Sequence, residues 1–122
     1  MNFGVSLQSH IQHSWKHTVL AEQMGFTNVW FVDTQMLASD VYACMTLAAE
    51  HTNTIQLGTA VAIAGTRIAP VIAHSIATVN QLAPGRVILG LGTGHTAWRA
   101  MGMPPVRLDT FRATIEVCRK LL

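Results

Sequence analysis

The sequence predicts an α/β fold of the (β/α)8 TIM-barrel type, of which this chain supplies the first four strand–helix units. Four short apolar segments alternate with four segments whose apolar residues recur at helical spacing. The strand segments are nearly continuous apolar runs, which is typical of a parallel sheet buried on both faces. Because a complete barrel needs about 250 residues, a chain of 122 residues can hold at most four of the eight units.

The first unit begins with a strand over residues 2–7, which is rich in residues that favour strands. A polar loop then leads to Ser14, a side chain suited to cap a helix. Apolar residues recur at helical spacing as far as Gly25, which suits the left-handed conformation that ends many helices. The second strand follows over residues 28–32.

The second unit continues with a helix that ends near His51. Either Ser39 or Asp40 can cap its first turn, because both side chains accept hydrogen bonds from exposed backbone N–H groups. The third strand is predicted over residues 55–61.

The third helix begins near Pro70, because proline is tolerated in a first helical turn. It ends near Leu82, before a Pro-Gly pair, and a fourth strand follows over residues 87–91. The last helix covers residues 109–122, with apolar positions on one face. No linker or low-complexity segment interrupts the pattern, so residues 1–122 are expected to form one unit, the N-terminal half of a single barrel domain.

The composition bears on partners and location. The formal charge is +2, and no basic run suits a phosphate backbone, so we expect no nucleic-acid partner. No apolar run approaches the roughly 18 residues of a membrane span, and the start lacks the charged region of a signal peptide. Cys44 and Cys118 stand far apart in the sequence and form no Cys-x-x-Cys motif. We therefore expect two buried free thiols in a reducing compartment. We therefore expect a cytoplasmic protein without a membrane contact.

Polar residues follow each predicted strand, at the end where parallel α/β folds bind ligands. They are Gln8 after the first strand, residues 33–35 after the second, 59–61 at the end of the third and 92–95 after the fourth. Because these strand ends meet at one edge of the sheet, we expect one cleft to contain Asp33, Ala60, Val61, Thr93 and Gly94. A mostly apolar wall with a few converging polar groups suits a planar cofactor.

Two ionisable side chains of this cleft are candidates for catalysis. Asp33 directly follows a buried strand, so its carboxylate must find a partner or reach a solvated pocket. The alternative for Asp33 is a cap for the segment after the strand. His95 can exchange a proton near neutral pH, and its alternative is an ordinary surface histidine.

The glycines of Gly90-x-Gly92-x-Gly94 let a ligand approach the backbone closely, and Thr93 adds a hydroxyl. A Rossmann dinucleotide site is disfavoured, because it needs Gly-x-Gly-x-x-Gly in the first βα turn and an acid ending the next strand. A metal site is not expected, because no carboxylate or cysteine joins the histidines at 10–17 to complete a ligand set. No Gly-x-Ser-x-Gly elbow supports a serine nucleophile.

Three blocks of the sequence match a known family. They are residues 24–33, which end in Val-Trp-Phe-Val-Asp, residues 55–61, and the long stretch 66–94 with its Leu-Ala-Pro-Gly-Arg and Gly-x-Gly-x-Gly segments. On these blocks the sequence resembles, nearly end to end, the luciferase-like superfamily of flavin- and deazaflavin-dependent oxidoreductases.

The resemblance implies that the ring of FMN or of the deazaflavin coenzyme F420 lies at the carboxyl ends of the strands. The residues that match its binding positions are Asp33, Thr59, Ala60, Val61, Thr93 and Gly94. It also implies a distorted backbone at Ala60–Val61, with a cis peptide bond that does not involve proline. Relatives often carry histidine after the acid of the second strand and sometimes glutamate after the glycine motif, where this chain has Thr34 and His95.

The implied function is hydride transfer or monooxygenation of a small-molecule substrate, with His95 and Asp33 as the candidate catalytic residues. The alternative is a non-catalytic half-barrel that associates with itself or with a C-terminal half. Four strands cannot close a barrel of eight, so we expect an open sheet whose edge strands favour association into an oligomer.

Overall fold

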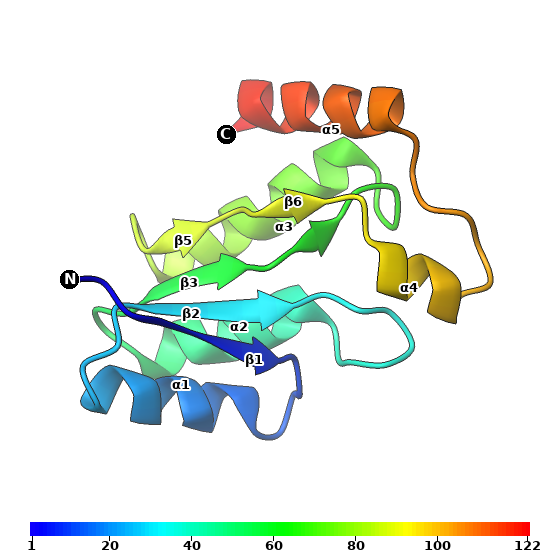
Figure 1. The fold of residues 1–122 in the computed structure, drawn as a ribbon. Coiled ribbons are helices and arrows are strands. Elements are labelled where there is room, and N and C mark those ends of the chain that lie inside the picture. Colours follow the sequence, from blue (N-terminus) through cyan, green and yellow to red (C-terminus); the bar gives the residue numbers. More distant parts are fainter.

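The computed structural model describes residues 1–122 and contains six strands and five helices (Figure 1). The elements, in chain order, are β1 Gly4–Gln8, α1 Ser14–Gln23, β2 Asn28–Val32, α2 Val41–His51, β3 Gln56–Thr59, β4 Ala62–Ile63, α3 Ala69–Leu82, β5 Val87–Ile88, β6 Leu91–Gly92, α4 His95–Ala100 and α5 Leu108–Leu121. None of the helices has the length and apolar character that a membrane span requires.

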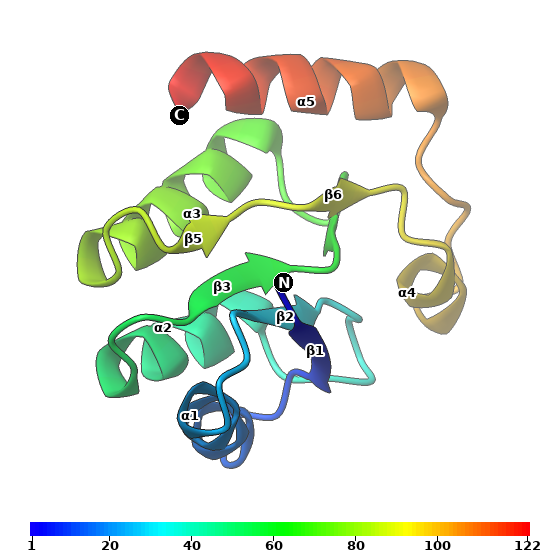
Figure 2. The same cartoon turned by 60° about the vertical axis from the view of Figure 1, so that its left-hand side comes forward.

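Four strands form an open parallel sheet in the order β1-β2-β3-β5, with β1 and β5 at its edges. The short strands β4 and β6 pair in parallel as a separate two-stranded sheet. Helices α1, α2 and α3 lie along one side of the four-stranded sheet, and α5 packs on α3 (Figure 2). The predicted α/β class and the parallel arrangement of strand–helix units are therefore confirmed.

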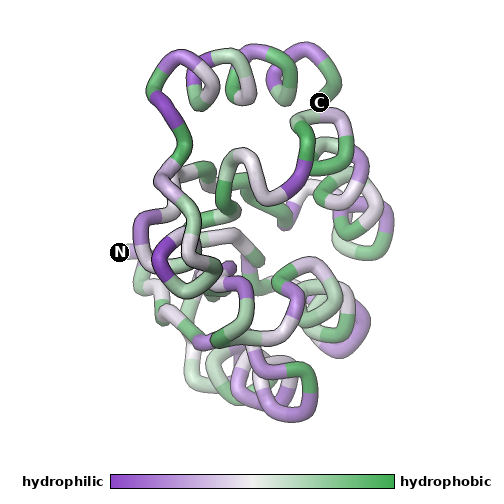
Figure 3. Tube along the Cα trace, turned by 90° about the vertical axis from the view of Figure 1, so that its right-hand side faces the viewer, coloured by the Kyte–Doolittle hydropathy of each residue, from purple (hydrophilic) through white to green (hydrophobic).

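The main core lies between the sheet and these helices. Alternate residues of β2 and β3, such as Val29, Phe31 and Leu57, are fully buried there against Met45 of α2. α5 extends this layer by burying Cys118, and Figure 3 shows hydrophilic and hydrophobic residues alternating along this helix. Burial of one face of the sheet and of one stripe of each helix follows from the two sequence periods.

The opposite face of the sheet carries a large side chain between two glycines. The indole of Trp30 fills the space that a side chain at Gly4 or Gly58 would occupy. Pairing one bulky residue with small neighbours is how the interior of a small barrel is filled. The pattern supports the interpretation that these four strands are part of a barrel.

Two predicted strands are each split in the structure. The expected strand 55–61 is broken between β3 and β4, and the expected strand 87–91 is broken between β5 and β6. Gly58 pairs with Ile88, 30 residues later, whereas Ala62 pairs with Leu91, only 29 residues later. One extra residue is thus accommodated between β3 and β4, which defines a β-bulge and shifts the ladder.

Three other details of the prediction are corrected. Ser14 does not cap α1 but is its first residue, and its hydroxyl donates to the carbonyls of Gln8 and His10 at 3.0 and 2.9 Å. The loop after residue 94 contains a short helix, α4, that no periodic pattern marked. Element ends also move by one or two residues, so that β1 ends at Gln8 and α5 begins at Leu108.

Other local signals are confirmed. Asp40 caps α2 by accepting a hydrogen bond from the backbone N–H of Ala43 at 3.0 Å. Gly25 follows α1 with a φ of 84°, the left-handed conformation expected of it.

A carboxylate from α1 organises the loop that enters β3. Oε1 of Glu22 accepts hydrogen bonds from the backbone N–H groups of Asn53, Thr54 and Ile55, at 3.0, 2.7 and 2.9 Å. Burial raises the pKa of Glu22, but the hydrogen bonds from Ile55, Thr54 and Asn53 outweigh it and leave the pKa below the ordinary value of 4.5. Folding therefore stabilises the ionised form of Glu22 relative to its protonated form.

We expect Glu22→Gln to destabilise the fold by about 2 kcal/mol at neutral pH, since hydrogen bonds to a charged acceptor are the strong ones. A lowered folded pKa gives a contribution that is complete above pH 4.5 and is lost as the pH falls through the folded pKa. The difference from wild type should therefore shrink in acid. Urea denaturation at several pH values measures it, with the exposed Glu50→Gln on α2 as control. Equal losses in both variants would contradict the prediction.

Candidate functional site

A cleft of about 390 Å³ lies at the carboxyl ends of the central strands. It is lined by residues 32–34 after β2, residues 60, 61 and 63 around the bulge, and residues 92–97 from the end of β6 into α4. The structure therefore brings together Asp33, Ala60, Val61, Thr93 and Gly94, as expected for residues that follow parallel strands.

The bulge between β3 and β4 supplies the apolar floor of this cleft. The peptide bond between Ala60 and Val61 is cis, as the resemblance predicted. Both residues are exposed although their neighbours Thr59 and Ala62 are buried, and the Val61 side chain is 40% exposed. An exposed apolar side chain at the centre of a cleft offers a surface on which a flat ring can lie.

Thr59, one of the predicted binding residues, does not line the cleft. It is buried, and its hydroxyl donates to the Gly90 carbonyl at 2.8 Å and accepts from the Gly90 N–H at 2.9 Å. The side chain joins β3 to the segment between β5 and β6. These two bonds support the shape of the bulge.

The opposite wall of the cleft consists of the glycine segment and the start of α4. Gly94 has a φ of 74°, and a side chain there would collide with Ile63 across the cleft wall. The indole N–H of Trp98 donates to the Thr93 carbonyl at 2.8 Å, which fixes the segment from below. His95 is the first residue of α4 and stands exposed on the cleft.

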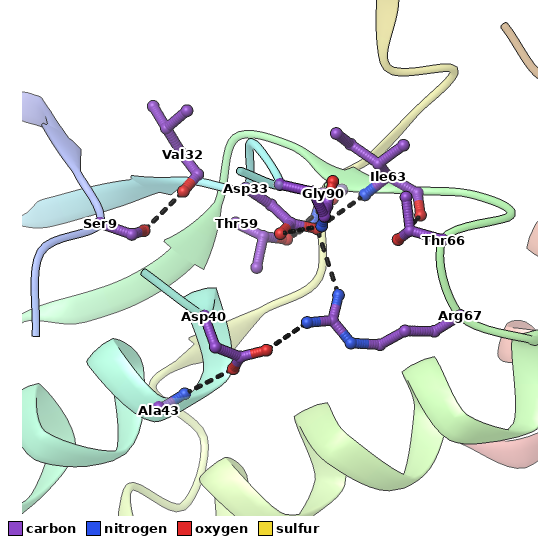
Figure 4. Close-up of polar contacts among 11 residues, drawn as sticks. Ser9, Val32, Asp33, Asp40, Ala43, Thr59, Ile63, Thr66, Arg67 and Gly90 are labelled. Carbon is purple, nitrogen blue, oxygen red and sulfur yellow. Dashed lines mark hydrogen bonds and ion pairs between the residues drawn. The ribbon is translucent and has the colours of Figure 1, made fainter. Parts of the chain in front are cut away.

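Asp33 is almost fully buried, with an exposed fraction of 3%, and both of its carboxylate oxygens have protein partners. Figure 4 shows it beside Ile63 and Arg67. Oδ1 accepts from Nε2 of Gln35 at 2.7 Å, and Oδ2 accepts from the backbone N–H of Ile63 at 3.1 Å and from Nη1 of Arg67 at 3.4 Å. Burial raises the pKa of Asp33, while the Ile63 hydrogen bond and the Arg67 charge oppose the rise. The bond to Ile63 ties the end of β2 to β4, just after the bulge.

Arg67 is a site residue that the sequence did not single out by itself. It lies in the loop between β4 and α3, and its guanidinium joins Asp33 to Asp40 (Figure 4). One signal was available, because Arg67 is the only Asp, Glu, Lys or Arg between Glu50 and Arg86. A single charge in a long apolar stretch has to be paired if it is buried.

The remaining predicted residues are spread around the cleft. Thr34 lines it, but Gln8 turns its amide to the Leu37 carbonyl at 3.2 Å. No group of three His, Cys, Asp or Glu side chains is placed to bind a metal ion.

Comparison with known sequences identifies relatives over most of the chain. The profile of the family described as luciferase-like monooxygenase matches residues 1–122. The chain is 48% identical over 105 residues to a 5,10-methylenetetrahydromethanopterin reductase of Methanolobus tindarius, which covers 84% of the chain and 32% of that protein. It is 41% identical over 121 residues to an F420-dependent glucose-6-phosphate dehydrogenase of Intrasporangium calvum, covering 86% and 36%. The chain thus spans about a third of the length of these relatives.

Solved structures agree with this result. The coenzyme F420 dependent tetrahydromethanopterin reductase of Methanopyrus kandleri superimposes with a TM-score of 0.78 at 31% identity, over 84% of the chain and 30% of that structure. The oxygenating constituent of 3,6-diketocamphane monooxygenase of Pseudomonas putida, in complex with FMN, gives a TM-score of 0.82 at 17% identity, over 99% and 39%. The second likeness shows a common fold.

Proposed function

The chain belongs to the luciferase-like monooxygenase family, and on this premise we propose that it forms the cofactor-binding part of an oxidoreductase that uses coenzyme F420 or FMN. The observation that carries the proposal is the cleft around the bulge at Ala60–Val61. Coenzyme F420 is the first candidate, because two relatives above 40% identity are, by name, an F420-dependent dehydrogenase and a methylenetetrahydromethanopterin reductase.

The residues of the cleft fit a planar ring. Val61 and Ala60 present an apolar surface, and the glycines at 92 and 94 let the Val61 and Ile63 side chains pack closely against the neighbouring segment. A volume of about 390 Å³ lies within the range of small-molecule sites. Thr93 adds a hydroxyl within hydrogen-bonding reach of the cleft.

We assign roles to the cleft residues on this basis. Ala60, Val61, Thr93 and Gly94 hold the ring, and Asp33 and Thr59 fix the bulge on which it lies. When bound, the cofactor supplies hydride transfer at its ring. His95 stands exposed at the mouth and is positioned to exchange a proton with a substrate. Undiminished turnover of a His95→Gln variant that still binds the cofactor would remove the assignment of His95.

The cofactor assignment is tested by titrating the chain separately with coenzyme F420 and FMN and following their absorbance and fluorescence. We expect Val61→Asp to raise the dissociation constant at least about tenfold, because it places a charge against an apolar ring face. The matched control is Val71→Asp on α3, whose valine is similarly exposed, 43% against 40%, but lies outside the cleft. The control should bind within about threefold of wild type. Equal losses in both variants, or no binding of either cofactor, would remove the proposal.

We propose further that residues 1–122 act as the N-terminal half of a barrel. The edge strands β1 and β5 have one neighbour each in the open sheet, which favours pairing with further parallel strands. Those strands can come from the same polypeptide or from a second copy. If this chain is instead a half-barrel without catalysis, it should associate while binding neither cofactor, which gel filtration beside the titration distinguishes.

A further inference from the structure

One cation stands between two carboxylates beside the cleft. Nη1 of Arg67 contacts Oδ2 of Asp33 at 3.4 Å, and Nη2 contacts Oδ2 of Asp40 (Figure 4). The three side chains come from different segments: the end of β2, the cap of α2 and the loop before α3. The chain is folded so that a single guanidinium serves both acids.

The environment of Arg67 holds this geometry. Only 21% of its side chain is exposed, and its guanidinium carbon lies 5.0 Å from the centre of the Tyr42 ring. Contact with an aromatic face and two charged acceptors restricts a planar guanidinium far more than it would a lysine ammonium. Arg67 is therefore confined between the start of α2 and the floor of the cleft.

The contacts form a continuous path to the bulge. Asp40 accepts a hydrogen bond from the Ala43 N–H at the first turn of α2 and binds Arg67, which binds Asp33. Asp33 in turn accepts from the N–H of Ile63, two residues after Val61. Each contact is a hydrogen bond or an ion pair with a charged partner. Such contacts are stronger than those between neutral groups and restrict the geometry of the two partners more.

We infer that Arg67 is a positioning residue, which keeps the buried carboxylate of Asp33 ionised and directed at the Ile63 N–H, and so fixes the bulge on which the cofactor ring is proposed to lie. The inference rests on the proposed function for its consequence in binding. The charge state of Asp33 itself is a property of the chain alone.

The groups that face Asp33 set the expected signs. Arg67 is the cation, Asp40 is a like charge, Tyr42 contributes a neutral phenol from α2, and His95 lines the same cleft from α4. Removing Arg67 leaves the buried acid with neutral donors, which raises its pKa. Removing the charge of Asp40 has the opposite sign, because a like charge is lost.

The first experiment follows the carboxyl carbon of Asp33 by ¹³C NMR across a pH titration, without cofactor. The chain has only three aspartates, Asp33, Asp40 and Asp109, so selective labelling gives three signals. Arg67→Met should move the Asp33 midpoint to higher pH, and Asp40→Asn should move it to lower pH. Arg67→Lys should restore most of the midpoint because it restores the charge. The signal of the distant Asp109 is the internal control.

An Asp33 midpoint that is the same in wild type and in a folded Arg67→Met variant would overturn the inference. If Arg67→Met does not fold, the other two variants decide. An Asp33 midpoint that Asp40→Asn fails to lower, or that Arg67→Lys moves far from the wild-type value although it keeps the charge, would also overturn the inference.

The second readout is cofactor affinity. Arg67→Met should bind coenzyme F420 or FMN about tenfold more weakly at pH 7, a change of about 1.4 kcal/mol. The loss should grow as the pH is lowered, whereas the affinity of wild type changes less. Wild-type affinity and pH dependence in a folded Arg67→Met variant would overturn the positioning role. If wild type binds neither cofactor, the proposed function fails, while the NMR titration still tests Arg67.

Discussion

Replacing Asp33 with alanine is expected to destabilise the fold by about 3 kcal/mol and to abolish cofactor binding. The substitution removes the acceptor of the Ile63 N–H, of the Gln35 amide and of one arm of Arg67 at a buried position. Breaking a buried charge pair by removing one partner costs several kcal/mol, because the other groups are left without compensation. The bulge that Asp33 ties to β2 would lose its support, and with it the floor of the cleft. Urea unfolding and cofactor titration measure the two effects.

The variant Asp33→Asn separates charge from shape and has a distinctive pH dependence. The folded pKa of Asp33 is raised above 3.8, first by burial, so the folded chain holds this proton more tightly than the unfolded chain does. Its contribution to stability is therefore complete below pH 3.8 and falls as the pH rises through the folded pKa. The stability difference between wild type and Asp33→Asn should be largest in acid and smaller near neutrality. A difference that grows with rising pH would contradict the buried position of this carboxylate.

Replacing Gly90 with alanine is expected to destabilise the fold by about 3 kcal/mol. A Cβ atom at Gly90 would overlap the backbone carbonyl oxygen of Thr59, which cannot move away as a flexible side chain can. Two hydrogen bonds hold the segments of Gly90 and Thr59 together, because the Gly90 carbonyl accepts from the Thr59 hydroxyl and from the Ala62 N–H, both at 2.8 Å. Overpacking a rigid site of this kind costs about 1 to 3 kcal/mol, and the register shift at the bulge makes the upper value the expected one.

The control for Gly90→Ala is Gly102→Ala, which has open space around the added carbon and a φ of 68°. Its cost is conformational, about 1 kcal/mol. The denaturation midpoints of both variants are measured together with cofactor titration. Their difference separates the cost of the steric contact at Gly90 from the cost of the backbone conformation at Gly102. Similar losses in the two variants would show that the contact with Thr59 is not rigid.

Several features of the site were predictable because they depend on short stretches of sequence. The polar residues at 33–35 and 92–95 follow apolar runs, and parallel strands place such ends at one edge of the sheet. The common cleft of Asp33, Val61 and Thr93 follows from strand order alone. The cis peptide at Ala60–Val61 was predicted differently, because only the resemblance to a family marked it.

Other features had no local signal. Thr59 was predicted to bind a ligand because it ends a strand, yet its hydroxyl bonds to Gly90, 31 residues away. The direction of one side chain at a bulge depends on how the neighbouring strand is aligned, and two or three residues of sequence do not encode that alignment. α4 was missed because six residues are too short to show a helical period.

The sequence by itself determined the order of the four strand–helix units, the cap at Gly25, a cap at Ser39 or Asp40, and the edge at which the cleft forms. These follow from residue periodicity and from turn and cap preferences, which act over three to seven residues. Only the tertiary structure decided the one-residue register shift at the bulge and the pairing of Arg67 with Asp33 and Asp40, which lie 34 and 27 residues away in the sequence. The physical reason is that a buried charge selects its partners after the strands have aligned, from whichever segments the packed core brings within reach.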